Sequence, residues 1–594
     1  MIAMRTRWIW VFVILSVNAN AAVYSVGPGQ PYEELGSLPW LTLAPGDTVR
    51  IHWRSKPYAS KIFLRVSGTP ENPIVIRGIP NENGDLPVLS GENATTDPQF
   101  IGYFSQQWTE DLGLFLIHRN TRVPPVDEES YKPKHIIFEY LEITGVKPSN
   151  TFIDQDGKTR NYNRFSSAIH ALEVENLTIR YCKIHDNAQG IFTNTNDGGE
   201  GYISRNILIE YNEIWGNGNA DDNGTEHNIY TQAAGTIIQF NRMGSLRPGS
   251  RGANIKDRSS GTIIRYNWIE GSARLLDLVE TEGGWRIILN EPNYHDVYVY
   301  GNIFVNDMTN DPFGVNMIHF GFDNDPELAK RGTLYFYHNT IFIKGDKENF
   351  WYVKVFDVTD DNDPATTEGR VNLYNNIVHK EGTTQLTLMR DGGTLNFYAN
   401  NWLYEDYDEL GYGATAEVNY IVNPILGSDP GFTDASAGDF TLTRSSPAVD
   451  RSHSLPAHIV SNYPLTKEYV KHADSKDRTL SGTAFDLGAL EYEGVTGLGN
   501  EDNDNPIIPF QLFDNYPNPF NPATTIAYRL FQPGWVELTV YNLQGMVVAN
   551  PVSEYQEAGR HSAIFNADHL PGGVYFYRLR VGNLSEVKKM VLLR

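Results

Sequence analysis

The most regular feature of the chain is a short segment in which aliphatic and polar residues alternate and an aromatic residue and Asn follow. ILIEYNEI at residues 207–214 and TIIRYNWI at residues 262–269 are two examples. Alternation with a period of two indicates a strand with one buried face, and the aromatic and Asn indicate a turn. The pattern occurs at residues 136–143, 177–184, 207–214, 236–243, 262–269, 297–304, 334–341, 371–378 and 395–402.

The spacing of these segments predicts a parallel β-helix. Their aromatic residues are 24 to 41 positions apart, and no helical period lies between them. A non-uniform repeat in this range is typical of stacked β coils with loops of different length. Stacked Asn side chains can tolerate a left-handed backbone and hydrogen-bond to the next coil. Residues 24–43 are expected to cover the open first coil, since an exposed strand edge recruits other chains.

The two ends of the chain have a different composition. Residues 1–21 have a charged start, an apolar run too short to span a membrane and a small-residue end, so they predict a secretory signal peptide. Residues 22–493 form the expected β-helix domain, and residues 494–508 are a Gly-, Asn- and Asp-rich linker. Residues 509–594 contain alternating strands and predict a separate small β domain. The predicted fold is therefore all-β.

The last domain carries several short motifs. They are YPNPFNP at residues 516–522, VYN at 540–542, GGVYFY at 572–577 and KKM at 588–590. Together they resemble the C-terminal sorting domain of type IX secretion cargo. The resemblance implies an immunoglobulin-like sandwich that engages the type IX secretion machinery and directs export across an outer membrane. The protein is then expected to be secreted or attached to the cell surface.

Charge and cysteine content exclude several functions. The formal net charge of −24 disfavours general binding to nucleic acid or to an anionic membrane. The single cysteine, Cys182, allows no internal disulfide and no CxxC metal site, and we expect a monomer. Residues 242–274 are a local exception, because they contain seven basic and two acidic residues, which gives a local charge of +5. This basic island predicts a site for an anionic ligand.

Register arguments bring candidate side chains together in this island. With Ile255 pointing inward, Asn254, Lys256 and Arg258 should point outward on one face. Residues 228–232 should stack on residues 254–258, so that Tyr230 lies about 4.8 Å along the axis. His227, Tyr230, Lys256 and Arg258 are therefore predicted to line one groove.

This set of residue types suits β-elimination on a uronate polysaccharide. The reaction removes a weakly acidic proton beside a carboxylate, and Arg258 or Arg251 can neutralise that carboxylate. Lys256 is the candidate base, and Tyr230 or His227 the candidate proton donor. The remaining predicted substrate-binding residues are Asn228, Gln232, Asn254, Arg274 and Glu280.

The segment KDRSSGTIIRYN at residues 256–267 resembles polysaccharide lyases of the alginate lyase and chondroitinase B type. The resemblance implies an acidic polysaccharide substrate and places Lys256 at the basic residue of that family. Gly249, Arg251 and Ala253 stand where the family has calcium-binding acids, so no metal site is predicted there and Arg251 is expected to replace the ion. The family's Arg on the following coil falls near Val279 and Glu280.

Two other functions remain open from the sequence. Asp257, Asp277, Glu280 and Glu282 offer paired carboxylates for a glycoside hydrolase. A glycan-binding surface protein or adhesin without catalysis is the third reading. Ca²⁺ is the one alternative cofactor, because the acidic loops at residues 221–223 and 357–363 offer oxygen ligands.

Overall fold

The protein is a chain of two compact units in a computed structural model, Met1–Gly494 and Val495–Arg594. The described residues are 21–104, 110–118, 132–220, 224–271, 273–309, 315–348, 350–358, 369–493, 510–530, 534–543, 545–557, 559–581 and 584–593. The predicted signal peptide, apart from Ala21, and the predicted linker lie outside these residues, as do residues 221–223 and most of 357–363. Within the described ranges, no helix is long and apolar enough to cross a membrane.

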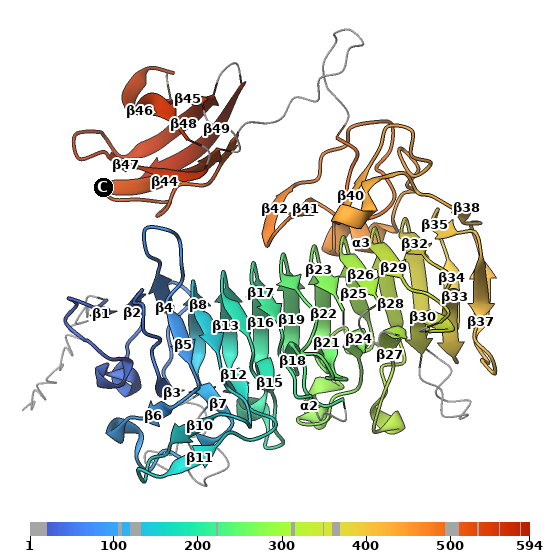
Figure 1. The fold of residues 1–594 in the computed structure, drawn as a ribbon, viewed down its shortest axis with the longest axis horizontal. Coiled ribbons are helices and arrows are strands. Elements are labelled where there is room, and N and C mark those ends of the chain that lie inside the picture. The colour runs from blue at the N-terminus through green and yellow to red at the C-terminus, as the bar shows by residue number, and fades with distance from the viewer. Residues whose placement is uncertain are drawn as a thin grey trace, which may run out of the picture. The chain divides into compact units, whose positions relative to one another are not determined.

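The first unit is the predicted parallel β-helix, built from three long sheets (Figure 1). Sheet 1 contains β11 (Thr159–Asn161), β10 (Thr151–Ile153), β6 (Ala94–Thr96), β3 (Ser60–Leu64), β7 (Gly113–Ile117), β12 (Ser167–Leu172), β15 (Gln189–Asn194), β18 (Ile229–Thr231), β21 (Ala253–Asp257), β24 (Arg274–Leu278), β27 (Asn316–Phe320), β30 (Tyr352–Val358), β33 (Gln385–Asp391) and β36 (Tyr407–Leu410). Sheet 2 contains β1 (Val23–Val26), β2 (Thr48–His52), β4 (Ile74–Ile79), β8 (Lys134–Glu139), β13 (Glu175–Arg180), β16 (Arg205–Glu210), β19 (Ala234–Gln239), β22 (Ser260–Arg265), β25 (Val297–Tyr300), β28 (Thr333–Tyr337), β31 (Arg370–Tyr374), β34 (Thr394–Phe397) and β37 (Glu417–Tyr420). Sheet 3 contains β5 (Val88–Ser90), β9 (Glu142–Thr144), β14 (Lys183–His185), β17 (Glu213–Trp215), β20 (Arg242–Met243), β23 (Trp268–Glu270), β26 (Ile303–Asp307), β29 (Thr340–Lys344), β32 (Ile377–Glu381), β35 (Trp402–Tyr404) and β38 (Ile425–Gly427).

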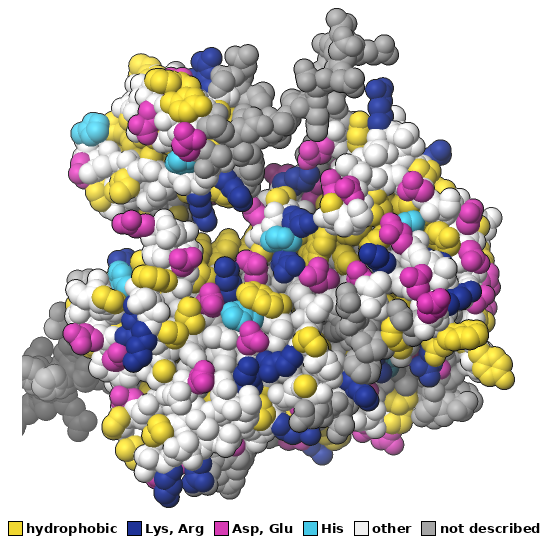
Figure 2. Space-filling model, viewed as in Figure 1, with side chains coloured by type: hydrophobic (Ala, Val, Ile, Leu, Met, Phe, Trp, Pro, Cys, Tyr) yellow, Lys and Arg dark blue, Asp and Glu magenta, His cyan; other side chains and the backbone are white. Residues whose placement is uncertain are grey.

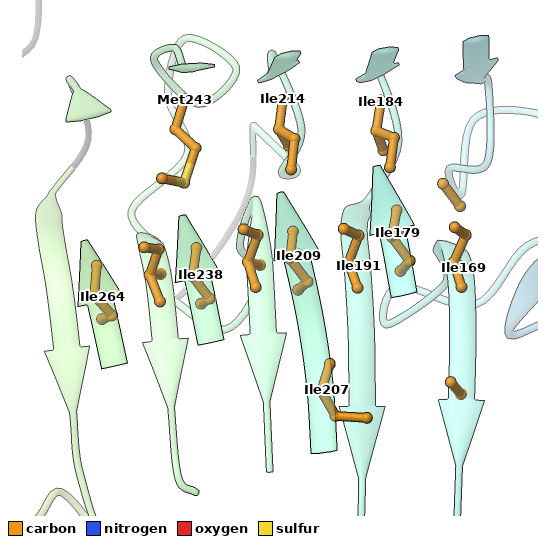
Figure 3. Close-up of a cluster of buried hydrophobic side chains, with 14 of the residues drawn as sticks. Ile169, Ile179, Ile184, Ile191, Ile207, Ile209, Ile214, Ile238, Met243 and Ile264 are labelled. Carbon is orange, nitrogen blue, oxygen red and sulfur yellow. The ribbon is translucent and has the colours of Figure 1, made fainter. Parts of the chain in front are cut away.

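Each coil contributes one strand to each sheet in turn, and the same row of side chains repeats from coil to coil. In sheet 1 the partners Ile169, Ile191, Ile229 and Ile255 lie in register and are fully buried. Figure 3 shows that isoleucines from neighbouring coils line up inside the coils. Each such side chain contributes about 1.5–3 kcal/mol on burial, so the repeated aliphatic positions supply the main driving force for stacking.

The repeated Asn residues form a hydrogen-bonded ladder at the corner between sheets 2 and 3, as predicted. The side-chain oxygen of each Asn accepts the backbone N–H of the ladder residue on the previous coil at 2.9–3.0 Å. Its members include Asn212, Asn241, Asn267, Asn302, Asn339 and Asn376, all of them buried. The predicted left-handed residue was wrong by one position, because Tyr211, Phe240 and Tyr266 take that conformation, with φ of 54–57°, and not the Asn that follows.

The first stack of aromatic residues before the ladder ends at Tyr266, and Tyr300 begins another stack with Tyr337. Tyr211, Phe240 and Tyr266 have neighbouring ring centroids 4.8 and 5.2 Å apart and nearly parallel planes. Tyr300 instead meets Tyr266 at 83°, because Tyr300 pairs in register with Arg265 and Gly301 takes the left-handed position. The nine aromatic residues are therefore not all equivalent, which the alignment of the repeat did not predict.

Two segments cover the coils, one at the open end of the first coil and one along the outer faces of two sheets. At the first coil, two short 3-10 turns, η1 (Leu35–Ser37) and η2 (Trp40–Thr42), bury Leu35 and Trp40 completely, in agreement with a cap at residues 24–43. Residues 429–493 were not predicted to fold back along the coils, but they lie against the outer faces of sheets 2 and 3 (Figure 1). There β40 (Asp439–Leu442) packs Phe440 on Trp268 and Phe342. This covering segment also contains β39 (Phe432–Asp434), η6 (Ala435–Ala437), α3 (Ala457–Asn462), β41 (Lys467–Val470) and β42 (Asp474–Asp477).

The second unit is a small all-β domain, as predicted. One antiparallel sheet contains β43 (Phe510–Leu512), β44 (Ala523–Leu530) and β47 (Gly559–Asn566). The other contains β46 (Val547–Gln556), β45 (Gly534–Tyr541), β48 (Gly573–Val581) and β49 (Leu584–Leu592). Phe520, Ile526, Tyr528, Leu538 and Tyr577 belong to its own buried core, which indicates a self-contained unit.

The ladder predicts a measurable cost for losing one Asn. Asn267→Ala should lower the free energy of unfolding by roughly 3 kcal/mol, because several buried backbone groups lose their partners at about 1–3 kcal/mol each. Asn290→Ala is the control, since Asn290 is exposed and donates one hydrogen bond to Arg286. Its change should stay within about 0.5 kcal/mol in urea unfolding followed by circular dichroism. Equal stability of the two variants would contradict a structural ladder.

Candidate functional site

A row of polar side chains runs along the outer face of sheet 1. The register pairs Tyr230 with Lys256, Lys256 with Asp277, and Asp277 with His319, one residue from each of β18, β21, β24 and β27. Ile255, next to Lys256, is fully buried on the inner face. The predicted outward direction of Lys256 and its place beside Tyr230 are therefore confirmed.

Lys256 is held between two carboxylates. Its ammonium group donates to Asp277 Oδ2 at 2.7 Å and to Asp323, which lies in the loop after β27. The other oxygen of Asp277 is 2.6 Å from His319 Nδ1 and 3.3 Å from an Arg274 nitrogen. Burial raises the pKa of Asp277, but Lys256 and His319 outweigh it and hold that pKa well below its usual value. Asp277 is thus a buried anion that holds the Lys256 ammonium group in place.

Arg258 joins the same cluster through both of its terminal nitrogens. One nitrogen donates to the Glu280 carbonyl at 2.6 Å and lies 3.2 Å from its carboxylate. The other lies 2.8 Å from Asp323 and 2.9 Å from Glu282. Burial lowers the pKa of Arg258, but the carboxylates of Asp323, Glu282 and Glu280 raise it more, so the guanidinium stays charged. Arg258 therefore holds the three carboxylates together, and its charge is paired with them.

Glu280 is the anchor of the loop that carries Asp323. It is fully buried, and its oxygens accept the backbone N–H groups of Asp323, Asn324 and Asp325 at 2.8–3.0 Å. Burial raises the pKa of Glu280, partly offset by Arg258. Glu280 was predicted to bind substrate, but its hydrogen bonds are used to position the loop.

Asp323 and Glu282 form the solvent side of the cluster. Their side chains are 22% and 49% exposed, against 2% for Arg258. One nitrogen of Arg258 and the amide nitrogen of Asn324 each contact one oxygen of Asp323 and one oxygen of Glu282. Since each contact is about 3 Å long, these two oxygens are no more than about 6 Å apart. Burial raises the pKa of Asp323, but Lys256 and Arg258 lower it further, so the net shift is downward. The site thus presents two carboxylates of different environment at close range.

Tyr230 closes the other side of this pair. Its hydroxyl donates to Glu282 Oε2 at 3.3 Å. Burial raises its pKa, so the phenol keeps its proton. Its ring stacks on Phe192 at 4.9 Å, and Phe192 stacks on His170 at 4.6 Å. Because the ring of Tyr230 packs against Phe192, its contribution to the acid pair is its hydroxyl group.

His227 and Gln232 border this cluster, because the His227 ring lies 5.8 Å from that of Tyr230 and Gln232 accepts the backbone N–H of Glu282 at 3.2 Å, but their other hydrogen bonds are structural. His227 Nδ1 accepts the backbone N–H of Ala253 at 2.8 Å, and Gln232 donates to Thr195 and the Gly283 carbonyl. Asn228 and Asn254 are buried in a second hydrogen-bonded Asn row, with Asn228 donating to Asn254. The simple alternation predicted that Asn254 shares the outward face with Lys256. This prediction was wrong, because Asn254 is buried in the Asn row.

The remaining predicted residues divide between core and surface. Arg251 is exposed in the loop before β21. Asp257, a candidate carboxylate for hydrolysis, instead points inward and accepts hydrogen bonds from Thr231 and Thr262. Arg274 contacts Asp277.

The basic residues of segment 242–274 do not form one positively charged groove. Lys256 and Arg258 are matched by Asp277, Glu280, Glu282 and Asp323. Arg242 pairs with Glu270 on sheet 3, away from this row. Figure 2 shows acidic and basic side chains interspersed over the face in view. The local excess of positive charge along the chain is therefore balanced in space by acids from other coils.

Asp323, Asn324 and His319 were missed from the sequence. Asp323 and Asn324 lie in an irregular loop, FGFDNDPEL at residues 320–328, which no repeat position identifies. His319 could have been found, because MIHF at residues 317–320 alternates like the strand of the preceding coils.

Comparison with known proteins adds information mainly for the second unit. No curated protein matches the sequence. A GH136 lacto-N-biosidase from Eubacterium ramulus shares 12% identity over 68% of each chain with a TM-score of 0.36. A mannuronic acid specific polysaccharide family 6 lyase from human gut microbiota shares 12% identity over 63% of this chain and 82% of its own, with a TM-score of 0.27. Both likenesses are too low to carry an argument about this chain.

The tail gives the clearer result. Residues 514–593 match the family model of the secretion system C-terminal sorting domain. This match agrees with the motifs of the second unit, and it implies interaction with the secretion machinery. The protein thus carries a C-terminal sorting domain, which indicates that it is secreted or located at the cell surface.

Proposed function

We propose that the β-helix unit is a glycoside hydrolase that cleaves an extracellular polysaccharide with Asp323 and Glu282. One observation carries the proposal: these two acids lie side by side at the exposed edge of a charge cluster, bridged by Arg258 and Asn324. Glycoside hydrolysis needs two carboxyl groups flanking the scissile bond. The sorting domain supports a substrate outside the cell.

The environments of the two acids suggest different roles. Lys256 and Arg258 keep Asp323 ionised, which suits a nucleophile at the anomeric carbon. Glu282 is half-exposed on the solvent side of the pair, which suits the second role, protonation of the leaving oxygen. Water would then release the sugar from Asp323 while Glu282 takes up the proton.

The separation favours a retaining reaction. Carboxyl groups in retaining enzymes are about 5–5.5 Å apart, whereas inverting enzymes need about 6.5–9.5 Å for a water molecule. The oxygens of Asp323 and Glu282 that share Arg258 and Asn324 lie within about 6 Å of each other, so the pair fits the shorter, retaining separation better than the longer one.

β-Elimination on a uronate is the second candidate, because Lys256 does lie next to Tyr230 and Arg258 as that chemistry requires. Two features make it the weaker one. A base must be unprotonated, whereas Lys256 donates to two carboxylates. The Arg258 nitrogens that would hold a uronate already bind Glu280, Glu282 and Asp323.

The products separate the candidates. Full-length protein incubated with laminarin, xylan and mannan, and with alginate, pectate, chondroitin and hyaluronate, should release reducing ends without ultraviolet absorbance from unsaturated sugars. Unsaturated ends would support elimination. Retardation in a glycan-containing gel without any cleavage would support a binding protein.

Substitution of the acid pair tests the assigned residues. Asp323→Asn and Glu282→Gln should each lower kcat/KM by at least about 100-fold, since each removes a group that acts in the transition state. Glu270→Gln is the matched control, because Glu270 also pairs with an arginine and is similarly exposed, but lies on sheet 3. Full activity of Asp323→Asn would exclude the proposed pair.

The pH profile tests the role of Lys256. Lys256 lowers the pKa of Asp323, so Lys256→Met should raise that pKa. Asp323 acts as the anion, and the acidic limb of the kcat/KM profile should therefore move to higher pH, with activity kept on the alkaline side. Loss of activity at every pH, with an unchanged melting temperature, would instead indicate that the amine is the base.

A further inference from the structure

A polar hollow lies on sheet 3, on a different face of the coils from the Lys256 cluster. It has a volume of about 510 Å³. It is bounded by β32 and β35 of sheet 3 and by residues 428–436, where the covering segment begins. Its lining includes His379, Lys380, Tyr404, Asp429, Phe432 and Asp434. None of these belongs to the cluster around Lys256, which faces outward from sheet 1.

His379 supplies a buried polar atom to this hollow. The side chain is 6% exposed and lies within 6.0 Å, between ring centroids, of Phe342, Trp402, Tyr404 and Phe432. Burial lowers its pKa to about 4, so the ring is neutral at pH 7. Among the described residues its Nδ1 has no hydrogen-bond partner. Such an atom costs about 1–3 kcal/mol when it stays unbonded, so the wall of the hollow contains an unsatisfied polar group.

Trp402 provides a second buried group beside it. Its indole nitrogen is also without a partner among the described residues, and the residue is fully buried. Its ring centroid is 5.7 Å from that of His379. Trp402 does not line the hollow itself, so its indole nitrogen is a second unsatisfied polar group in the packed layer behind it.

The charges around the hollow define the ligand. Lys380 is 5% exposed, donates to the Gly382 carbonyl at 3.0 Å and lies 4.6 Å from the centre of the Tyr404 ring. Glu381, Asp429 and Asp434 oppose this single positive charge, so an anionic ligand is disfavoured. Hydrogen bonds from Ser436 and the backbone keep the pKa of Asp434 low, so its carboxylate accepts hydrogen bonds.

We infer that this hollow binds a neutral saccharide as a non-catalytic glycan site. Sugar hydroxyls can donate to the carboxylates and accept from Lys380, and His379 can bond to them with its ring nitrogen. The aromatic rings of Tyr404 and Phe432 offer apolar contact to the carbohydrate C–H groups. The inference does not depend on cleavage at Asp323 and Glu282, because it concerns binding on another sheet.

The test is affinity electrophoresis of the full-length protein in native gels containing laminarin, xylan or galactomannan. His379→Phe keeps a ring among its aromatic neighbours, and Lys380→Met keeps the side-chain length. Each should weaken retardation by one of these glycans about 10-fold. Lys344→Met, on the adjacent strand of sheet 3 but exposed, is the control and should bind like the wild type. Asp323→Asn should also keep this binding.

Melting temperatures distinguish lost binding from lost folding, and Lys380→Met remains informative where His379→Phe unfolds. The inference is overturned when no neutral glycan retards the wild type, or when both variants bind as well as Lys344→Met. Retardation that a chelator abolishes would assign the hollow to a cation and would also overturn it.

Discussion

The alignment of successive coils is the constraint on which the rest of the structure depends. Backbone hydrogen bonds hold neighbouring parallel strands about 4.8 Å apart, and a slip of one residue would move every side chain to the opposite face. The buried Asn ladder and the aliphatic rows fix that alignment at many coils at once. Tyr230, Lys256, Asp277 and His319 can form one row only because the register is held this firmly.

Within that row, the balance of charge decides what the site can do. Lys256 and Arg258 are almost completely buried, so each needs partners, and four carboxylates from the following coils provide them. The positive charges in turn keep Asp323 ionised at the surface. The same residues that seemed suited to hold a uronate therefore hold acids, which is the reason for proposing hydrolysis and not elimination.

The covering segment at residues 429–493 changes the outside of the β-helix. It places Phe440 on Trp268 and Phe342 and so turns an open sheet face into a second packed layer. Where this layer ends, His379 and Lys380 remain buried beside a hollow. The proposed reaction site on sheet 1 and the proposed glycan site on sheet 3 thus lie on different faces of the same coils.

The sequence by itself determined the parallel β-helix, its first-coil cap, the sorting domain and the outward direction of Lys256, because these follow from local alternation and from repeated or motif residues. It could not determine the partners of Lys256. Asp323 is 67 positions away in a loop with no periodic signal, and only the stacking of coils brings it into contact. The sequence likewise could not place Asn254 or the segment at residues 429–493, because both depend on which buried surface remains to be filled after the coils have formed. Local pattern thus decides which face a strand residue occupies, whereas long-range packing decides which charges meet there.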